Sequence, residues 1–128
     1  MDKVCLRHLL FILISITFSE VKADTFTQAT AGALNEDGDR FGRVLATGDF
    51  NGDGFDDLVA SAPYEDTSDA TDGGILFIFY GSLQGLSNTS ETITQNSIVT
   101  ATNEDGDRLG WALAVGNFNG DEYEDLAV

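Results

Sequence analysis

The sequence has few of the side chains on which most enzymes and disulfide-bonded domains depend. Its 128 residues include one cysteine, one histidine, one proline and one tryptophan. Cys5, His8 and both lysines lie within the first 23 residues. Residues 24–128 therefore exclude a Ser-His-Asp triad, a Cys-His pair, a Schiff-base lysine and a histidine or thiolate zinc site.

Residues 1–23 have the pattern of a secretory signal peptide. Lys3 and Arg7 give a positive start, residues 9–18 (LLFILISITF) are apolar, and Val21 and Ala23 place short side chains before a cleavage point. The apolar run has ten residues, whereas a membrane span takes about 20. We expect export of residues 24–128 with no membrane span; an uncleaved anchor or a buried helix is the alternative. An exported domain without disulfides needs another stabiliser, and bound metal is one.

Cations are scarce in the predicted exported part. Arg40, Arg43 and Arg108 stand against 20 acidic residues in 24–128, so the formal charge there is -17. Such a surface repels phosphate backbones and anionic lipid, which excludes nucleic acid as a partner, and it suits divalent cations. High acidity alone also fits a disordered chain. The compact runs of Phe, Ile, Leu and Val favour a packed core instead.

An internal repeat organises the chain. Residues 33–59 and 101–127 align at an offset of 68 without a gap, with 17 of 27 positions identical. We expect one unit over residues 33–100 and a second starting at residue 101 and present only as residues 101–128, with residues 24–32 as a short preceding segment. This is about one and a half units, whereas a propeller has about 4–8 blades. The chain is therefore expected to be a fragment of a larger propeller.

Short strands separated by turns are predicted, and no stretch shows helical periodicity. The expected strands are residues 44–47, 57–61 and 75–80, with a weaker one within 91–100. The run 75–80 (ILFIFY) is apolar at every position, so both of its faces should be covered. Together with the long repeat, this predicts an all-β fold of β-propeller blades. A two-sheet sandwich is the alternative.

The strongest chemical motif is the loop of residues 49–57, DFNGDGFDD. Side-chain oxygens occupy its first, third, fifth and ninth positions, and Gly54 occupies the sixth. Calcium takes about 6–8 hard oxygen ligands, and a curled loop that presents every second residue supplies them. The predicted ligands are Asp49, Asn51, Asp53, the backbone carbonyl of Phe55, and Asp57. The loop is not an EF-hand, because strands flank it. A metal-free Asp/Asn/Gly turn is the alternative.

The second repeat carries a weaker copy of this loop in residues 117–125. Asn117 replaces the first aspartate and Glu122 replaces the glycine, so we expect a strained turn and weaker binding. The predicted ligands are Asn117, Asn119, Asp121, the carbonyl of Tyr123, and Asp125.

A further polar cluster, residues 35–40 with its copy 103–108, also alternates oxygens. It lacks an acid at the ninth position, so we interpret it as a solvated turn, with a weak cation site as the alternative. Arg40 and Arg108 are expected to pair with neighbouring aspartates.

These residues together resemble the FG-GAP repeat of the integrin α-subunit N-terminal propeller and its bacterial relatives. Phe41-Gly42 matches the FG element, residues 49–57 match the calcium loop, and Ser61-Ala62-Pro63 stands where Gly-Ala-Pro is usual. The resemblance covers residues 33–85 and 101–128. Its departures are Ser61 for glycine, Leu109 for phenylalanine, and Glu122.

The resemblance implies an extracellular recognition or adhesion module, stiffened by calcium, that binds a protein or glycan ligand and is not an enzyme. The family also occurs as an accessory domain, so the alternative is the N-terminal accessory part of an exported phospholipase D-like hydrolase. A carboxylate-only glycosidase is a third class. It is disfavoured because the acids cluster in repeated turns.

Overall fold

The computed structural model describes residues 25–29, 33, 36–98 and 100–128, and the predicted signal peptide lies outside this part. The strands are β1 (Leu45–Gly48), β2 (Asp57–Ala62), β3 (Ile75–Phe79), β4 (Glu91–Ile93), β5 (Ala114–Gly116) and β6 (Asp125–Ala127). One short 3-10 helix, η1, covers Gln95–Ser97. Among the described residues there is no α-helix, and no helix that could cross a membrane.

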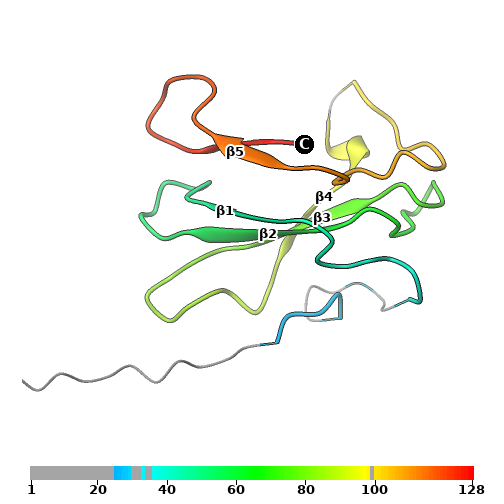
Figure 1. Ribbon diagram of the computed structural model, residues 1–128, viewed down its shortest axis with the longest axis horizontal. Coiled ribbons are helices and arrows are strands. Elements are labelled where there is room, and N and C mark those ends of the chain that lie inside the picture. Colours follow the sequence, from blue (N-terminus) through cyan, green and yellow to red (C-terminus); the bar gives the residue numbers. More distant parts are fainter. Residues whose placement is uncertain (1–24, 30–32, 34–35, 99) are drawn as a thin grey trace, which may run out of the picture.

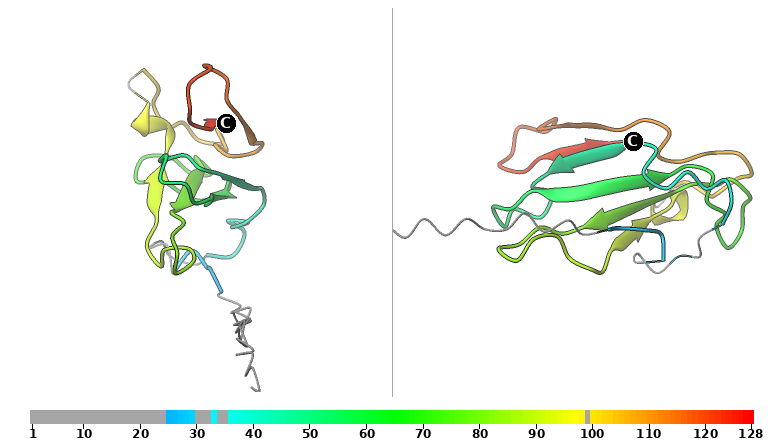
Figure 2. Two further views of the ribbon diagram at one scale, coloured as in Figure 1. Left: turned by 90° about the vertical axis from the view of Figure 1, so that its left-hand side faces the viewer. Right: turned by 60° about the horizontal axis from the view of Figure 1, so that its bottom comes forward.

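The strands form two antiparallel sheets. In the first repeat the order is β1-β2-β3-β4, so each strand pairs with its neighbours in sequence. In the second repeat β5 pairs with β6. The all-β prediction is confirmed, and the four-stranded antiparallel sheet has the form of a single propeller blade. Figures 1 and 2 show β5 lying beside β1, so the first strand of the second repeat lies next to the first strand of the first repeat.

Strands β2 and β3 form the centre of the sheet and are buried on both faces. Alternate residues point to opposite sides. Val59, Leu76 and Ile78 form one cluster, whereas Ala60, Phe77 and Phe79 belong to the other. The side chains of residues 76–79 are at most 7% exposed. This confirms the expectation that the apolar run is covered on both sides.

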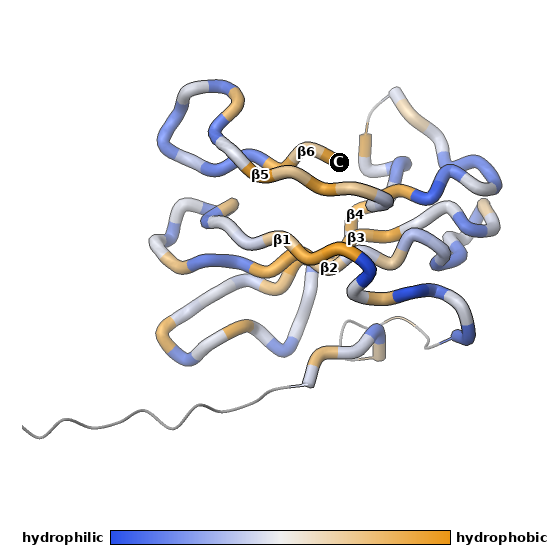
Figure 3. The backbone as a smooth tube through the Cα atoms, in the orientation of Figure 1, coloured by the Kyte–Doolittle hydropathy of each residue, from blue (hydrophilic) through white to orange (hydrophobic). Residues whose placement is uncertain are grey.

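Different parts of the chain cover the two faces. On one, Phe26 meets Phe79 with ring centroids 5.0 Å apart, and Phe41 meets Phe77 at 5.4 Å. On the other, Leu113 and Leu126 of the second repeat lie against the Val59–Leu76–Ile78 cluster. The first sheet is thus sandwiched between the N-terminal segment and the second repeat. Hydrophobic residues follow the strands, and the loops at the ends are mainly hydrophilic (Figure 3).

The meander separates two loop-bearing ends. The hairpin β1–β2 and the connection β3–β4 place residues 49–56 and 80–90 at one end of the sheet. The segments 36–43 and 63–74 lie at the other. The two predicted calcium loops share the first end, because Glu124 of the second contacts Asp49 of the first.

Candidate calcium loop and its surroundings

The first loop closes a tight hairpin. β1 and β2 pair up to Gly48 and Asp57, so residues 49–56 must reverse the chain. Gly52 and Gly54 have φ of 74° and 87°. Such left-handed angles favour glycine. The positive φ of Gly54 therefore explains why glycine is expected at the sixth position of the loop.

Asp49 organises the turn through its carboxylate. Its Oδ1 accepts hydrogen bonds from the backbone N–H groups of Gly52 at 2.7 Å and Asp53 at 3.1 Å. Its Oδ2 accepts one from the N–H of Gly54 at 2.9 Å. The loop is therefore curled around its first residue, as the alternating pattern predicts.

Asn51 and Asp53 continue the same geometry. Asn51 Oδ1 accepts from the Asp53 N–H at 2.8 Å, and Asp53 Oδ1 accepts from the Phe55 N–H at 2.9 Å. The Asn51 side-chain amide also donates to Asp53 Oδ2 at 3.0 Å. The first, third and fifth side chains thus all accept hydrogen bonds from backbone N–H groups of the same turn.

Asp57 anchors the base of the loop. Its side chain is only 1% exposed. Oδ2 accepts from the Phe50 N–H at 3.0 Å, and Oδ1 accepts from the Gly81 N–H at 2.8 Å. A buried carboxylate needs such hydrogen-bond donors. Because its two donors come from different loops, Asp57 links the β1–β2 hairpin to the β3–β4 connection.

The donor set fits a hard dication by its chemistry. Within the described residues no group of three or more His, Cys, Asp or Glu forms a metal set by itself. Calcium also takes amide and carbonyl oxygens, which Asn51 and Phe55 supply. Asp49 Oδ1 already accepts two hydrogen bonds, whereas Asp49 Oδ2 and both Asp57 oxygens accept one each and keep lone-pair capacity. Asn51 Nδ2 faces Asp53 Oδ2, so binding of a cation by these two side chains would require this contact to change.

The second loop reproduces part of this arrangement. Asn117 Oδ1 accepts from the Gly120 N–H at 2.6 Å. Its Nδ2 donates to the Asp121 carbonyl, so a donor stands where Asp49 presents a second acceptor. Asn119 Oδ1 accepts from the Asp121 N–H at 2.9 Å, and Asp121 Oδ1 from the Tyr123 N–H at 2.8 Å. Asp125 Oδ2 accepts from the Phe118 N–H at 2.7 Å.

The predicted strain at Glu122 is wrong. Among the described residues the non-glycine positions with positive φ are Arg40, Asp72 and Arg108. Glu122 therefore avoids the left-handed angle that Gly54 adopts, because a side chain there would be costly. The second loop differs from the first by its backbone path and by its missing carboxylate, and strain plays no part.

The opposite end of the sheet gathers the arginines around two aromatic rings. The Cζ atoms of Arg40 and Arg108 lie 4.4 Å and 4.8 Å from the Tyr64 ring centroid. Arg43 Cζ lies 3.9 Å from that of Trp111, and the two rings are 5.9 Å apart. Arg108 also approaches Asp72 at 3.7 Å. Arg108 thus pairs with an aspartate, as predicted, and this aspartate belongs to the first repeat.

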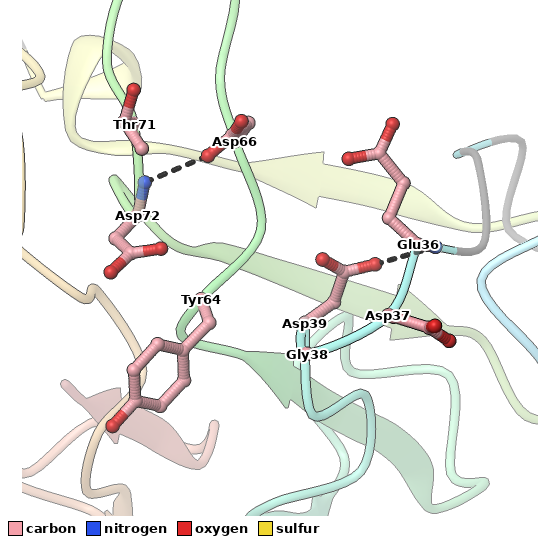
Figure 4. A pocket seen from close by; sticks show the side chains of 8 residues that line it. All are labelled: Glu36, Asp37, Gly38, Asp39, Tyr64, Asp66, Thr71 and Asp72. Atoms are coloured by element: carbon pink, nitrogen blue, oxygen red, sulfur yellow. Dashed lines mark hydrogen bonds between the residues drawn. The ribbon is translucent and has the colours of Figure 1, made fainter.

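An acidic cavity of about 260 Å³ lies beside this stack (Figure 4). Asp39 Oδ2 accepts from the Glu36 N–H at 2.8 Å, and Asp66 Oδ1 from the Asp72 N–H at 2.9 Å. The cluster predicted at residues 35–40 is therefore a turn, described here from residue 36 onward. The cavity is lined by Glu36, Asp37, Gly38, Asp39, Tyr64, Asp66, Thr71 and Asp72.

Glu65 is a buried acid that sequence reasoning missed. It is 8% exposed and accepts a hydrogen bond from the Gln28 side chain. Burial, and next the nearby Asp39, raise the pKa of Glu65 to about 7. No local pattern indicates this, because Gln28 and Asp39 come from distant segments.

Parts of the chain are similar to known proteins. The FG-GAP repeat matches residues 41–79. The chain is 39% identical over 89 residues, 70% of its length, to phosphatidylinositol-glycan-specific phospholipase D of Rattus norvegicus, and covers 10% of that protein. It is 34% identical over 92 residues, 71% of its length, to integrin alpha-PS3 of Drosophila melanogaster, and covers 8% of it. No solved structure gives a significant match. The chain therefore carries an FG-GAP repeat, built as an antiparallel blade, and is related over part of its length to integrin alpha chains and to phosphatidylinositol-glycan-specific phospholipase D.

Proposed function

We propose that the chain is part of an exported, calcium-binding FG-GAP module that recognises an extracellular protein or glycan and is not itself catalytic. The observation that carries this proposal is the curled loop 49–57, in which Asp49, Asn51 and Asp53 each accept hydrogen bonds from backbone N–H groups of the same turn. Asp57 holds the other end of the loop at the start of β2.

A bound calcium ion would supply positive charge among the carboxylates at the tip of the β1–β2 hairpin. Asp49 and Asp57 would then be linked across the hairpin, because Asp57 pairs with Gly48 at the end of the ladder and Asp49 follows Gly48. The chain's own residues stiffen the turn and leave the loops at the opposite end of the sheet available for a partner.

The acids of the described part support a binding role better than a catalytic one. Asp39, Asp49 and Asp57 all accept hydrogen bonds from backbone N–H groups of turns. Residues 24–128 also lack histidine, cysteine and lysine. Nucleophilic catalysis by the common routes is therefore without its usual groups.

A second candidate is an accessory part of an exported hydrolase. The observation that favours it is the 39% identity to phosphatidylinositol-glycan-specific phospholipase D. The chain spans about a tenth of that relative, so hydrolysis would require a catalytic part elsewhere. Incubation of the purified chain with a glycolipid-anchored protein tests whether the chain itself is catalytic: we expect no release of the protein, and release would overturn the non-catalytic proposal.

Calcium titration followed by NMR tests the preferred function. The backbone amides of Gly52 and Gly54 report the first loop, and that of Gly120 reports the second. We expect the first-loop amides to shift at lower calcium concentration, because Asp49 provides a carboxylate where Asn117 provides an amide. Amide positions that do not respond to calcium in either loop would contradict the proposal.

A further inference from the structure

The second repeat reaches directly onto the first calcium loop. Glu124 Oε2 accepts a hydrogen bond from the backbone N–H of Asp49 at 3.1 Å. The Glu124 N–H in turn faces the Asp49 carbonyl at 3.5 Å. A residue 75 positions away thus contacts both backbone polar groups of the residue that organises the first loop.

Two glycines of the first repeat make room for this contact. A Cβ on Gly48 would collide with Glu124 Oε2, and one on Gly52 would collide with the Tyr123 ring. At the equivalent positions of the second repeat no other segment approaches: a Cβ on Gly120 would have no atom within 4 Å, and one on Gly116 would meet only the Phe118 ring of its own loop, at 3.2 Å. The first loop therefore forms a contact surface for Tyr123 and Glu124. In the described part, no residue of another segment contacts the equivalent glycines of the second loop.

We propose that Glu124 is a positioning residue for calcium binding at the first loop. This inference rests on the proposed function and adds that the first loop is completed by the second repeat. Glu124 holds the backbone of Asp49, while the Asp49 carboxylate holds the amides of Gly52, Asp53 and Gly54. The acid fixes the residue on which the rest of the turn depends.

Charge adds to this positioning. Glu124 brings a further carboxylate against a loop that already contains Asp49, Asp53 and Asp57. An additional negative charge near a dication strengthens its binding, and salt weakens the effect at an exposed site. The three arginines lie at the opposite end of the sheet over Tyr64 and Trp111. Calcium affinity at the first loop should therefore depend on whether the second repeat is docked.

Three variants of residues 24–128 separate the contributions. Glu124→Gln keeps an oxygen that can accept from Asp49 N–H but removes the charge. Glu124→Ala removes both. Glu122→Gln is the matched control, since it changes the same charge in the same loop, and no contact of Glu122 with the first loop is seen in the described residues.

The measurement is the calcium Kd of the first loop, taken from the Gly52 and Gly54 amide shifts at low and high ionic strength. We expect Glu124→Gln to raise Kd about threefold at low salt, with the difference shrinking at high salt. Glu124→Ala should raise it about tenfold at low salt and keep part of this increase at high salt, because the lost hydrogen bond is not screened. Glu122→Gln should change it less than about twofold.

The failures are distinguishable. Calcium binding by the parent chain with equal Kd in the Glu124 and Glu122 variants would overturn this inference and leave the proposed function standing. A parent chain whose Gly52 and Gly54 amides ignore calcium would overturn both. Even if Glu124→Ala unfolds the chain, the isosteric Glu124→Gln decides the question.

Discussion

Two buried carboxylates show how the environment sets the behaviour of a single residue. Asp57 has two backbone N–H donors, from Phe50 and Gly81. Glu65 has one amide donor from Gln28 and lies beside Asp39. Burial and the neighbouring acid disfavour the ionised form of Glu65 and raise its pKa to about 7.

This difference gives a prediction for Glu65→Gln. In the unfolded chain the Glu65 carboxyl loses its proton near its ordinary pKa of 4.5, and in the folded chain near 7. The folded state therefore binds more protons between these values, and stability falls as pH rises through that window. When the pH is raised from 5 to 8 in excess calcium, we expect the Tm of the parent protein to fall more than the Tm of Glu65→Gln. Equal losses would show that Glu65 does not titrate in this way.

At the scale of the strand, the sequence predicts what local pattern controls. The continuous apolar run 75–80 contains β3, and the alternating oxygens with Gly54 predict the curled loop. Strand β1 begins one residue later than predicted, because Ser61 accepts hydrogen bonds from the backbone N–H groups just before it. Its hydroxyl accepts from the Val44 N–H at 3.1 Å and its carbonyl from that of Gly42 at 2.8 Å.

The central strand also supports a prediction about stability. Leu76 is fully buried between the sheet and the second repeat. Leu76→Ala should lower the free energy of unfolding by about 2–5 kcal/mol, through lost burial and the cavity left behind. Leu83→Ala is the control: Leu83 is 83% exposed, so its loss should cost less than about 0.5 kcal/mol. Chemical denaturation measures both, and similar costs would contradict the assigned core.

At the scale of the whole molecule, the two repeats are joined at several places. Leu113 and Leu126 lie against the middle of the sheet, and Glu124 contacts the calcium-loop end. At the opposite end Asp69 accepts from the side chains of Asn96 and Asn103 at 2.7 Å and 2.8 Å. The amide of Asn103, followed by that of Asn96, holds the pKa of Asp69 below its ordinary value.

These junctions could not be predicted from the sequence. The repeat predicts that two similar units exist, and the spacing within each loop predicts its ligands. The contacts of Glu124 with Gly48 and of Tyr123 with Gly52 depend on how the two units are placed relative to each other. The same holds for Phe26 on Phe79, whose residues are far apart in the chain. Local patterns carry no information about such placement.

The central claim is that the oxygens of every second residue from Asp49 onward bind calcium, and that the bound ion links β1 to β2. It is tested most directly by the Tm of Asp53→Ala measured with calcium and with chelator. At calcium about 100 times Kd, binding should contribute about 2.7 kcal/mol, so the variant should lose roughly 10 °C in calcium and nearly nothing in chelator. Asp56→Ala, in the same loop at a position with no predicted ligand role, should be little changed. An equal loss for Asp53→Ala in both conditions would mean that Asp53 only shapes the turn, and the calcium account would be wrong.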